Sequence, residues 1–117
     1  MRILYLEDQP SDAELVARYV ETTHHKLVTV DSIEAAWKAL EQPIDVIMMD
    51  IVIRGDRSGF TFAEALQEQG NDRPLVAITA LNTPNDMRRC RELGFDPILQ
   101  KPFTIDQLAD VLDQFIG

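Results

Sequence analysis

The sequence predicts an α/β fold: a doubly wound, five-stranded parallel sheet with helices on both faces. Along the 117 residues, short apolar runs alternate five times with stretches of helical spacing, and this alternation is typical of parallel sheets built from strand–helix units. The apolar runs are nearly continuous, as expected of strands covered on both sides. Crossovers between parallel strands are right-handed in nearly all proteins, which limits how the units can be connected.

The first predicted strand is the apolar run at residues 3–6. Ser11 and Glu14 match the Ser-x-x-Glu capping box, so we expect Ser11 to be the N-cap of the first helix. The apolar residues of this helix follow at helical spacing: Leu15, Val16, Tyr19 and Val20. The first unit is therefore a buried strand followed by an amphipathic helix.

The second unit begins at residues 26–30, which predict a strand because β-branched side chains are frequent there. Asp31 or Ser32 can cap the helix that follows. The apolar positions of that helix are Ile33, Ala36, Trp37 and Leu40. Pro43 marks a break in the chain, where the unit ends.

The third apolar run, residues 44–49, is the most apolar of the chain and predicts the central strand. It stops abruptly at Asp50. A glycine-containing loop then leads to a helix over about residues 60–69, and Gly70 with Asn71 predicts the carboxyl-terminal cap of that helix.

The fourth unit has its strand at residues 75–78, followed directly by Thr79. Thr83 and Pro84 predict an N-cap with proline at the first helical position. The pattern indicates that this helix runs to Leu93.

The last unit begins with a short strand predicted at residues 97–100. Thr104 and Gln107 form a second capping-box pattern. It opens a final helix that we expect to continue through Phe115.

Composition excludes several classes of protein. The formal charge of −9 argues against direct binding of nucleic acid, which needs lysine and arginine to neutralise phosphates. The single cysteine, Cys90, excludes an internal disulfide and a cysteine-based zinc site. No apolar stretch reaches the roughly 18–20 residues that span a bilayer, and Glu7 and Asp8 come too early for a signal peptide. We therefore expect a cytoplasmic protein that binds neither nucleic acid nor membrane.

Polar residues follow four of the predicted strands: Glu7 and Asp8, Asp50, Thr79, and Lys101. In the flavodoxin-like strand order 2-1-3-4-5, ligands bind at the carboxyl edge of the sheet, where the first and third strands lie side by side. Clustered carboxylates are costly unless a hard cation lies among them, and such oxygen ligands suit Mg²⁺. A lysine and a hydroxyl beside a metal-bound carboxylate are suited to holding a phosphoryl group.

These motifs, taken in order, resemble those of one protein family. They are Glu7-Asp8, Asp50, Thr79-Ala80 and Lys101-Pro102-Phe103. Over essentially its whole length the chain resembles the receiver domain of two-component response regulators, which implies a single receiver domain over residues 1–117. Each residue taken alone also fits an ordinary loop, cap or strand end, so the specificity comes from finding all of them at the expected strand ends.

The resemblance implies that Asp50 is a phosphoacceptor. It would take a phosphoryl group from a phosphohistidine on a histidine kinase or on a histidine phosphotransfer protein. The family's metal site implies that Mg²⁺ is held by Glu7, Asp8, Asp50 and the backbone carbonyl of Val52. No enzymatic activity is implied beyond self-catalysed phosphorylation and dephosphorylation.

The resemblance also assigns the remaining two site residues. Lys101 would pair with Asp50 before phosphorylation and with the phosphoryl group after it, and the Lys101–Pro102 bond is expected to be cis. Thr79 would donate a hydrogen bond to the phosphoryl group and draw the following loop inward. Phosphorylation would then alter the binding of a protein partner to the surface of the fourth helix, fifth strand and fifth helix.

Two departures from the family pattern leave an alternative open. Ile98 stands where family members usually carry an aromatic residue that moves with the threonine. The loop at residues 51–60 is about one residue longer than usual and contains Arg54 and Arg57. These arginines either contact the kinase or the phosphoryl group, or offset local negative charge, and we favour the second. The alternative is a pseudo-receiver, a protein-interaction module that works without phosphorylation.

Two further classes fit the residues less well. A phosphatase of the haloacid-dehalogenase type would need an aspartate at the position of Val52. A flavin carrier would need a phosphate-binding loop where Glu7 and Asp8 would repel the phosphate.

Overall fold

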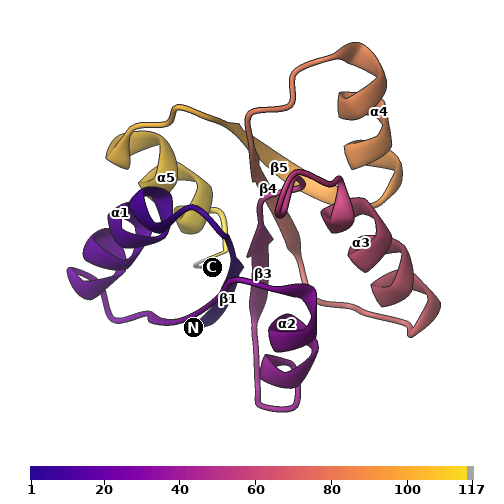
Figure 1. The fold of residues 1–117 in the computed structure, drawn as a ribbon. Helices are drawn as coiled ribbons and strands as arrows, with labels where there is room; N and C mark the ends of the chain where they lie inside the picture. The colour runs from indigo at the N-terminus through magenta and orange to yellow at the C-terminus, as the bar shows by residue number, and fades with distance from the viewer. Residues whose placement is uncertain (116–117) are drawn as a thin grey trace.

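The computed structural model describes residues 1–115, and in that part of the chain five parallel strands form one sheet (Figure 1). The strand order is β2-β1-β3-β4-β5, which confirms the predicted order. The strands are β1 (Arg2–Leu6), β2 (Lys26–Val30), β3 (Val46–Met49), β4 (Leu75–Thr79) and β5 (Phe95–Gln100).

Helices cover both faces of the sheet, as Figure 1 shows. On one face lie α1 (Pro10–Glu21) and α5 (Ile105–Asp113), and on the other lie α2 (Ile33–Ala39), α3 (Ser58–Glu68) and α4 (Pro84–Glu92). Side chains of β1 divide between the faces, because successive residues of a strand point to opposite sides. Ile3 and Tyr5 pack with α1 and α5, whereas Leu4 and Leu6 pack in the core beneath the other three helices.

Several helix caps agree with the sequence patterns. The hydroxyls of Ser32 and Thr83 accept hydrogen bonds from the amides of Ala35 and Asp86, at 3.1 Å each. Thr104 and Gln107 form the expected reciprocal capping box at the start of α5. These caps satisfy amide groups that have no partner within their own helix.

The predicted capping box of the first helix is wrong. The helix begins at Pro10, with Gln9 as an N-cap that makes no side-chain hydrogen bond. Proline fits the first helical position well because its fixed φ is already helical, so the helix starts before Ser11. Glu14 instead bonds Arg18 one turn further along, at 2.6 Å.

Smaller corrections concern where other elements begin or end, and they include the third strand, which begins at Val46 rather than at residue 44. The third helix begins at Ser58 rather than near residue 60, β5 begins at Phe95 rather than at residue 97, and α5 ends at Asp113 rather than at Phe115. Element ends are where local patterns carry least information, because helix ends fray and turns compete with them.

The strand register brings the polar strand ends to one edge of the sheet. Leu6 pairs with Met49, and Thr79 pairs with Gln100. The chain therefore leaves β1 and β3 at the same level, and the backbone amide of Asp50 donates to Leu6 O at 3.0 Å. At the end of β5, Lys101 N donates to Thr79 O at 2.9 Å. Among residues 1–115, no helix combines the length and apolar character required to cross a bilayer.

Candidate functional site

The ammonium group of Lys101 bonds three carboxylates at the carboxyl edge of the sheet. Its Nζ lies 2.6 Å from Glu7 Oε1 and 2.7 Å from Asp50 Oδ2. A third carboxylate oxygen, Asp12 Oδ2, lies 2.9 Å away. The contacts with Glu7 and Asp50 are hydrogen bonds, and the contact with Asp12 is an ion pair. The Lys101–Pro102 peptide bond that follows is cis, as expected.

Glu7 is the most enclosed of these carboxylates, with a fully buried side chain. Tyr5 donates its phenolic O–H to Glu7 Oε1 at 2.9 Å. Burial raises the pKa of the Glu7 carboxyl, and the hydrogen bond from Lys101 offsets only part of that rise. Burial, followed by the charge of Glu7, also raises the pKa of Tyr5, which therefore stays a neutral donor. Glu7 is thus held from two sides, by Tyr5 and by Lys101.

Lys101 keeps its charge although its side chain is only 12% exposed. Burial lowers the pKa of its ammonium group, but the hydrogen bonds that it donates to Asp50 and Glu7, together with its contact with Asp12, outweigh burial and leave the pKa raised. A buried ion pair of this kind is costly to break, because removing one partner leaves the other charge without compensation. The lysine is therefore a fixed positive charge beside Asp50.

Asp50 is 6% exposed, and both of its carboxylate oxygens have partners in the resting structure. Oδ2 accepts from Lys101, and Oδ1 accepts from the backbone amide of Val52 at 3.1 Å. Gly59 allows α3 to approach this segment closely, since a Cβ there would lie 2.7 Å from Ile51 Cα and 3.0 Å from Asp50 O. The loop after β3 is therefore held firmly behind the carboxylate of Asp50.

Asp8 reaches the same rim by a different contact. Its Oδ2 accepts a hydrogen bond of 2.7 Å from the backbone amide of Arg54. Arg54 and Gly55 have φ values of 53° and 82° and form the middle of a tight turn closed by Ile53 and Asp56. The longer loop after β3 thus contributes an amide to Asp8, and this contact places Asp8 beside the segment that carries Asp50.

Thr79 is completely buried at the end of β4. Among the described residues, the structure shows one hydrogen bond at its hydroxyl oxygen, accepted from the amide of Leu81 at 3.2 Å. The O–H of Thr79 is therefore available as a donor to a further acceptor at this edge. Ala80, the next residue, is exposed and carries only a methyl group.

The side chain of Arg57 pairs with a carboxylate at the start of α4. Its guanidinium makes two hydrogen bonds of 3.1 Å to the carboxylate of Asp86, which also accepts from the Thr83 hydroxyl at 2.9 Å. The hydrogen bond from Arg57, followed by that from Thr83, lowers the pKa of Asp86. This pairing agrees with the interpretation that the arginine offsets a local negative charge. It also ties the start of α3 to the start of α4.

Ile98 is half-buried and packs against the core beneath α2, α3 and α4. It lies opposite Ala77 in the register of β4 and β5. An aliphatic side chain therefore occupies the position at which the family usually has an aromatic ring.

Sequence reasoning missed two residues of this site, Asp12 and Tyr5. Asp12 lies in the first turn of α1, four residues after Asp8. Helices that follow strands of a parallel sheet begin at the edge where those strands end, so an acidic residue in that turn was a usable signal. Tyr5 lies within an apolar run. Its hydroxyl was the one available signal, because a buried tyrosine O–H usually needs a hydrogen-bond partner.

The candidate metal-ligand atoms at this rim are all oxygens, which suit a hard cation. In residues 1–115, no group of three or more His, Cys, Asp or Glu side chains is already arranged as a metal cage. Mg²⁺ does not need one, because it keeps several waters and uses one or two protein carboxylates. Asp8 and Asp50, on neighbouring segments of the rim, therefore fit this ion as ligands, with Glu7 behind them.

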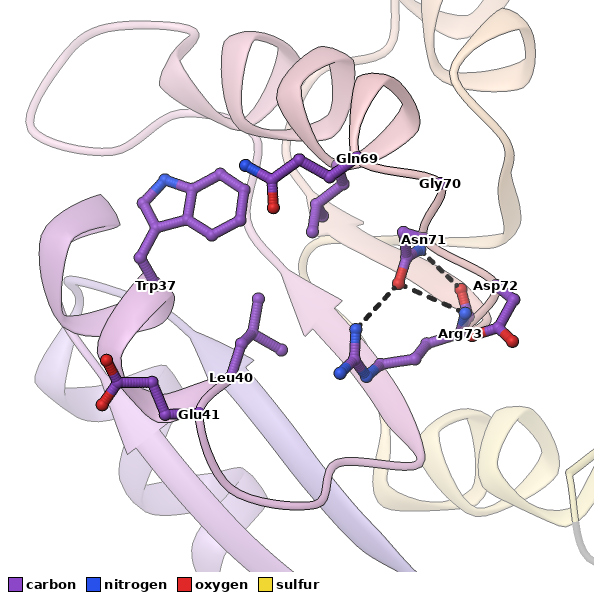
Figure 2. Close-up of a pocket in the computed structure, with 9 residues that line it drawn as sticks. Trp37, Leu40, Glu41, Gln69, Gly70, Asn71, Asp72 and Arg73 are labelled. Atoms are coloured by element: carbon purple, nitrogen blue, oxygen red, sulfur yellow. Dashed lines mark hydrogen bonds between the residues drawn. The ribbon is translucent and has the colours of Figure 1, made fainter.

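A separate hollow of about 270 Å³ lies at the other end of the sheet (Figure 2). Its walls include Trp37 on one side and Arg73 on the other, where Arg73 bonds Asn71 and the backbone oxygen of Ile44. Ile44 and Arg73 precede β3 and β4, whereas Asp50 and Thr79 stand where those strands finish. The hollow is therefore not part of the carboxylate site.

Comparison with known proteins agrees with this fold. The family model described as the response regulator receiver domain matches residues 3–113, and the chain belongs to this family. The sensor histidine kinase GacS of Pseudomonas protegens is 32% identical over 99% of the chain, and the heme response regulator HssR of Staphylococcus saprophyticus is 30% identical over 90%. The chain spans 13% of the former and 46% of the latter.

A solved structure is similar over nearly the whole chain. The receiver domain of the sensor histidine kinase PA1611 from Pseudomonas aeruginosa is 27% identical, with a TM-score of 0.83, and the match covers 99% of this chain and 97% of that one. That structure is described with a magnesium ion coordinated in the active-site cleft.

Proposed function

We propose that Asp50 accepts a phosphoryl group in a Mg²⁺-dependent reaction and that this modification changes the binding of a protein partner. The observation that carries the proposal is the pairing of a nearly buried Asp50 carboxylate with Lys101 at 2.7 Å. A nucleophile that sits beside a fixed positive charge is prepared for attack on an anionic group.

The chemistry follows from the positions of these side chains. A carboxylate oxygen of Asp50 attacks phosphorus, the P–N bond to the donor histidine breaks, and an aspartyl phosphate forms. Lys101 then donates its hydrogen bond to a phosphoryl oxygen instead of to the Asp50 carboxylate. Mg²⁺, held by Glu7, Asp8, Asp50 and the backbone carbonyl of Val52, would neutralise charge on the phosphoryl oxygens.

Thr79 supplies the response to the new group. Its O–H is available as a donor, and a phosphoryl oxygen on Asp50 is the acceptor that phosphorylation adds. A shift of Thr79 would move the β4–α4 loop, and with it the surface formed by α4, β5 and α5, where we place the downstream protein partner. Since Ile98 replaces the usual ring, this movement passes through the loop and α4.

The phosphodonor is proposed to be a histidine kinase or a histidine phosphotransfer protein. The similarity to segments of GacS and to HssR, which are a sensor kinase and a response regulator, supports this class of partner. Kinases of this kind draw on ATP, so we place the exchange in the cytoplasm. The chain acts on its own aspartate and has no other substrate in this scheme.

The test is phosphorylation by acetyl phosphate with Mg²⁺, followed by intact-mass measurement. We expect the native chain to gain the mass of one phosphoryl group and Asp50→Asn to gain none. Asp56→Asn, which removes an exposed carboxylate from the same loop, is the control and should behave like the native chain. Modification of Asp50→Asn at the native rate would refute the acceptor assignment, and no modification of the native chain would favour a pseudo-receiver.

A further inference from the structure

Asp12 is the one contact of Lys101 that the proposed phosphoryl chemistry leaves without a role. It reaches the site from the first turn of α1, whereas Glu7 and Asp50 follow strands β1 and β3. Its carboxylate lies 2.9 Å from Lys101 Nζ and remains 31% exposed. Lys101 is thus in contact with carboxylates from three different segments of the chain.

A third carboxylate at this position has an electrostatic cost. Glu7, Asp12 and Asp50 face a single ammonium group, and like charges in one site disfavour one another. An anionic phosphodonor approaching Asp50 would also be repelled by an additional carboxylate on the exposed side. Lys101 already has closer partners in Glu7 and Asp50, so charge neutralisation alone does not account for Asp12.

We propose that Asp12 is a positioning residue which, together with Glu7, anchors Lys101 so that its remaining N–H donor points to Asp50 and later to the phosphoryl group. This inference rests on the proposed function and deepens it by naming what orients the lysine. Lysine carries its charge on a flexible four-carbon stem with freely rotating donors. Two anchors on different elements remove that freedom.

The two anchors are held by different means. Glu7 is fixed within the core by the Tyr5 hydroxyl at 2.9 Å and by burial of its side chain. Asp12 is fixed by the start of α1, where Pro10 sets the first helical position. Neither anchor depends on the state of Asp50. The direction of the third donor therefore persists while Asp50 changes from a carboxylate to an acyl phosphate.

The experiment compares Asp12→Asn with the native chain in the absence of metal. Lys101 is one of only three lysines in the sequence, with Lys26 and Lys38, so ¹⁵N NMR of the lysine ammonium groups can resolve it. We expect exchange of the Lys101 ammonium protons with water to accelerate about tenfold, as the loss of one charge-assisted hydrogen bond implies. Asp12→Glu, which keeps the carboxylate, should restore part of the protection.

The matched control is Glu14→Gln. It removes the same charge from the same helix, but Glu14 pairs with Arg18 rather than with Lys101. We expect it to leave Lys101 exchange unchanged. Unchanged exchange in Asp12→Asn, or equal acceleration in both variants, would overturn the proposal.

The second readout is the rate of phosphorylation by acetyl phosphate at saturating Mg²⁺. We expect Asp12→Asn to slow it several-fold, while Glu14→Gln does not. Faster phosphorylation of Asp12→Asn would identify Asp12 as a repulsive charge and overturn its positioning role. If exchange accelerates in Asp12→Asn but the native chain takes up no phosphoryl group, the anchor is retained and the proposed function fails.

Discussion

Lys101 and Thr79 stand at the ends of neighbouring strands, yet the structure holds them very differently. Lys101 pairs with three carboxylates, whose oxygens lie 2.6–2.9 Å from its Nζ. Thr79 is more deeply buried, but among residues 1–115 its hydroxyl shows a single hydrogen bond, accepted from the amide of Leu81. Lys101 therefore already has carboxylate partners on several sides, whereas the O–H of Thr79 is still available to donate a hydrogen bond.

This difference agrees with separate proposed roles for Lys101 and Thr79. In the proposed function, Lys101 would fix the positive charge that prepares Asp50, and the Thr79 hydroxyl would bind the new acceptor that phosphorylation adds. The loop after Thr79 leads to α4, whose first turn is tied to the start of α3 by the Arg57–Asp86 ion pair. A movement that begins at Thr79 must therefore work against that tie.

Removal of the Lys101 ammonium group should have the largest effect, and it should act on stability. Lys101→Ala leaves the buried carboxylates of Glu7 and Asp50 without their partner, so we expect the free energy of unfolding at neutral pH to fall by about 3–5 kcal/mol. Urea unfolding measures this change. Lys38→Ala, which removes an exposed lysine from α2, should change stability little. Equal stability of the Lys101→Ala and native chains would show that the ion pairs are not formed.

Loss of the Thr79 hydroxyl should affect the conformational change at α4 rather than the modification of Asp50. We expect Thr79→Ala to be modified on Asp50, since Asp50 and Lys101 remain in place, but to lose most of the change at α4. Amide chemical shifts of α4 with beryllofluoride and Mg²⁺ measure that change. Thr61→Ala, an exposed position on α3, should respond like the native chain. A full α4 response in Thr79→Ala would remove Thr79 from the account.

A smaller effect concerns pH and Glu7. Burial raises the pKa of Glu7, so the folded chain binds this proton more tightly than the unfolded chain. The stability from the protonated form is present below the unfolded value of about 4.3 and is lost as pH rises through the raised folded value. We expect the stability of the native chain relative to Glu7→Gln to decline across that window in urea unfolding. A stability difference between the two chains that does not change with pH would contradict the raised pKa of Glu7.

The smallest expected effect lies at the Arg57–Asp86 pair. Because Arg57 and Thr83 lower the pKa of Asp86, its contribution to stability is present above the unfolded value of about 3.9 and is lost as pH falls through the depressed folded value. Asp86→Asn should therefore unfold with less acid dependence than the native chain, whereas Asp110→Asn, at an exposed position of α5, should not. Identical acid dependence in all three chains would mean that the pair contributes nothing.

The sequence predicted the polar strand ends of the site better than the contacts around them. The strand ends at Asp50, Thr79 and Lys101 followed from continuous apolar runs, because such runs end where a buried strand leaves the core. The contact of Asp12 depends on where α1 begins, and Pro10 placed that start before the residue suggested by the capping pattern. Arg57 and Asp86 are 29 residues apart, and no local spacing connects them.

The central claim is that Asp50 receives a phosphoryl group between the donors of Lys101 and Thr79. A crystal structure of the native chain with Mg²⁺ and beryllofluoride tests it most directly. The account predicts a beryllofluoride group on Asp50, with Lys101 Nζ and Thr79 Oγ1 both within hydrogen-bond distance of it and Mg²⁺ beside Asp8. An unmodified Asp50 that is still paired with Lys101 under saturating conditions would contradict it.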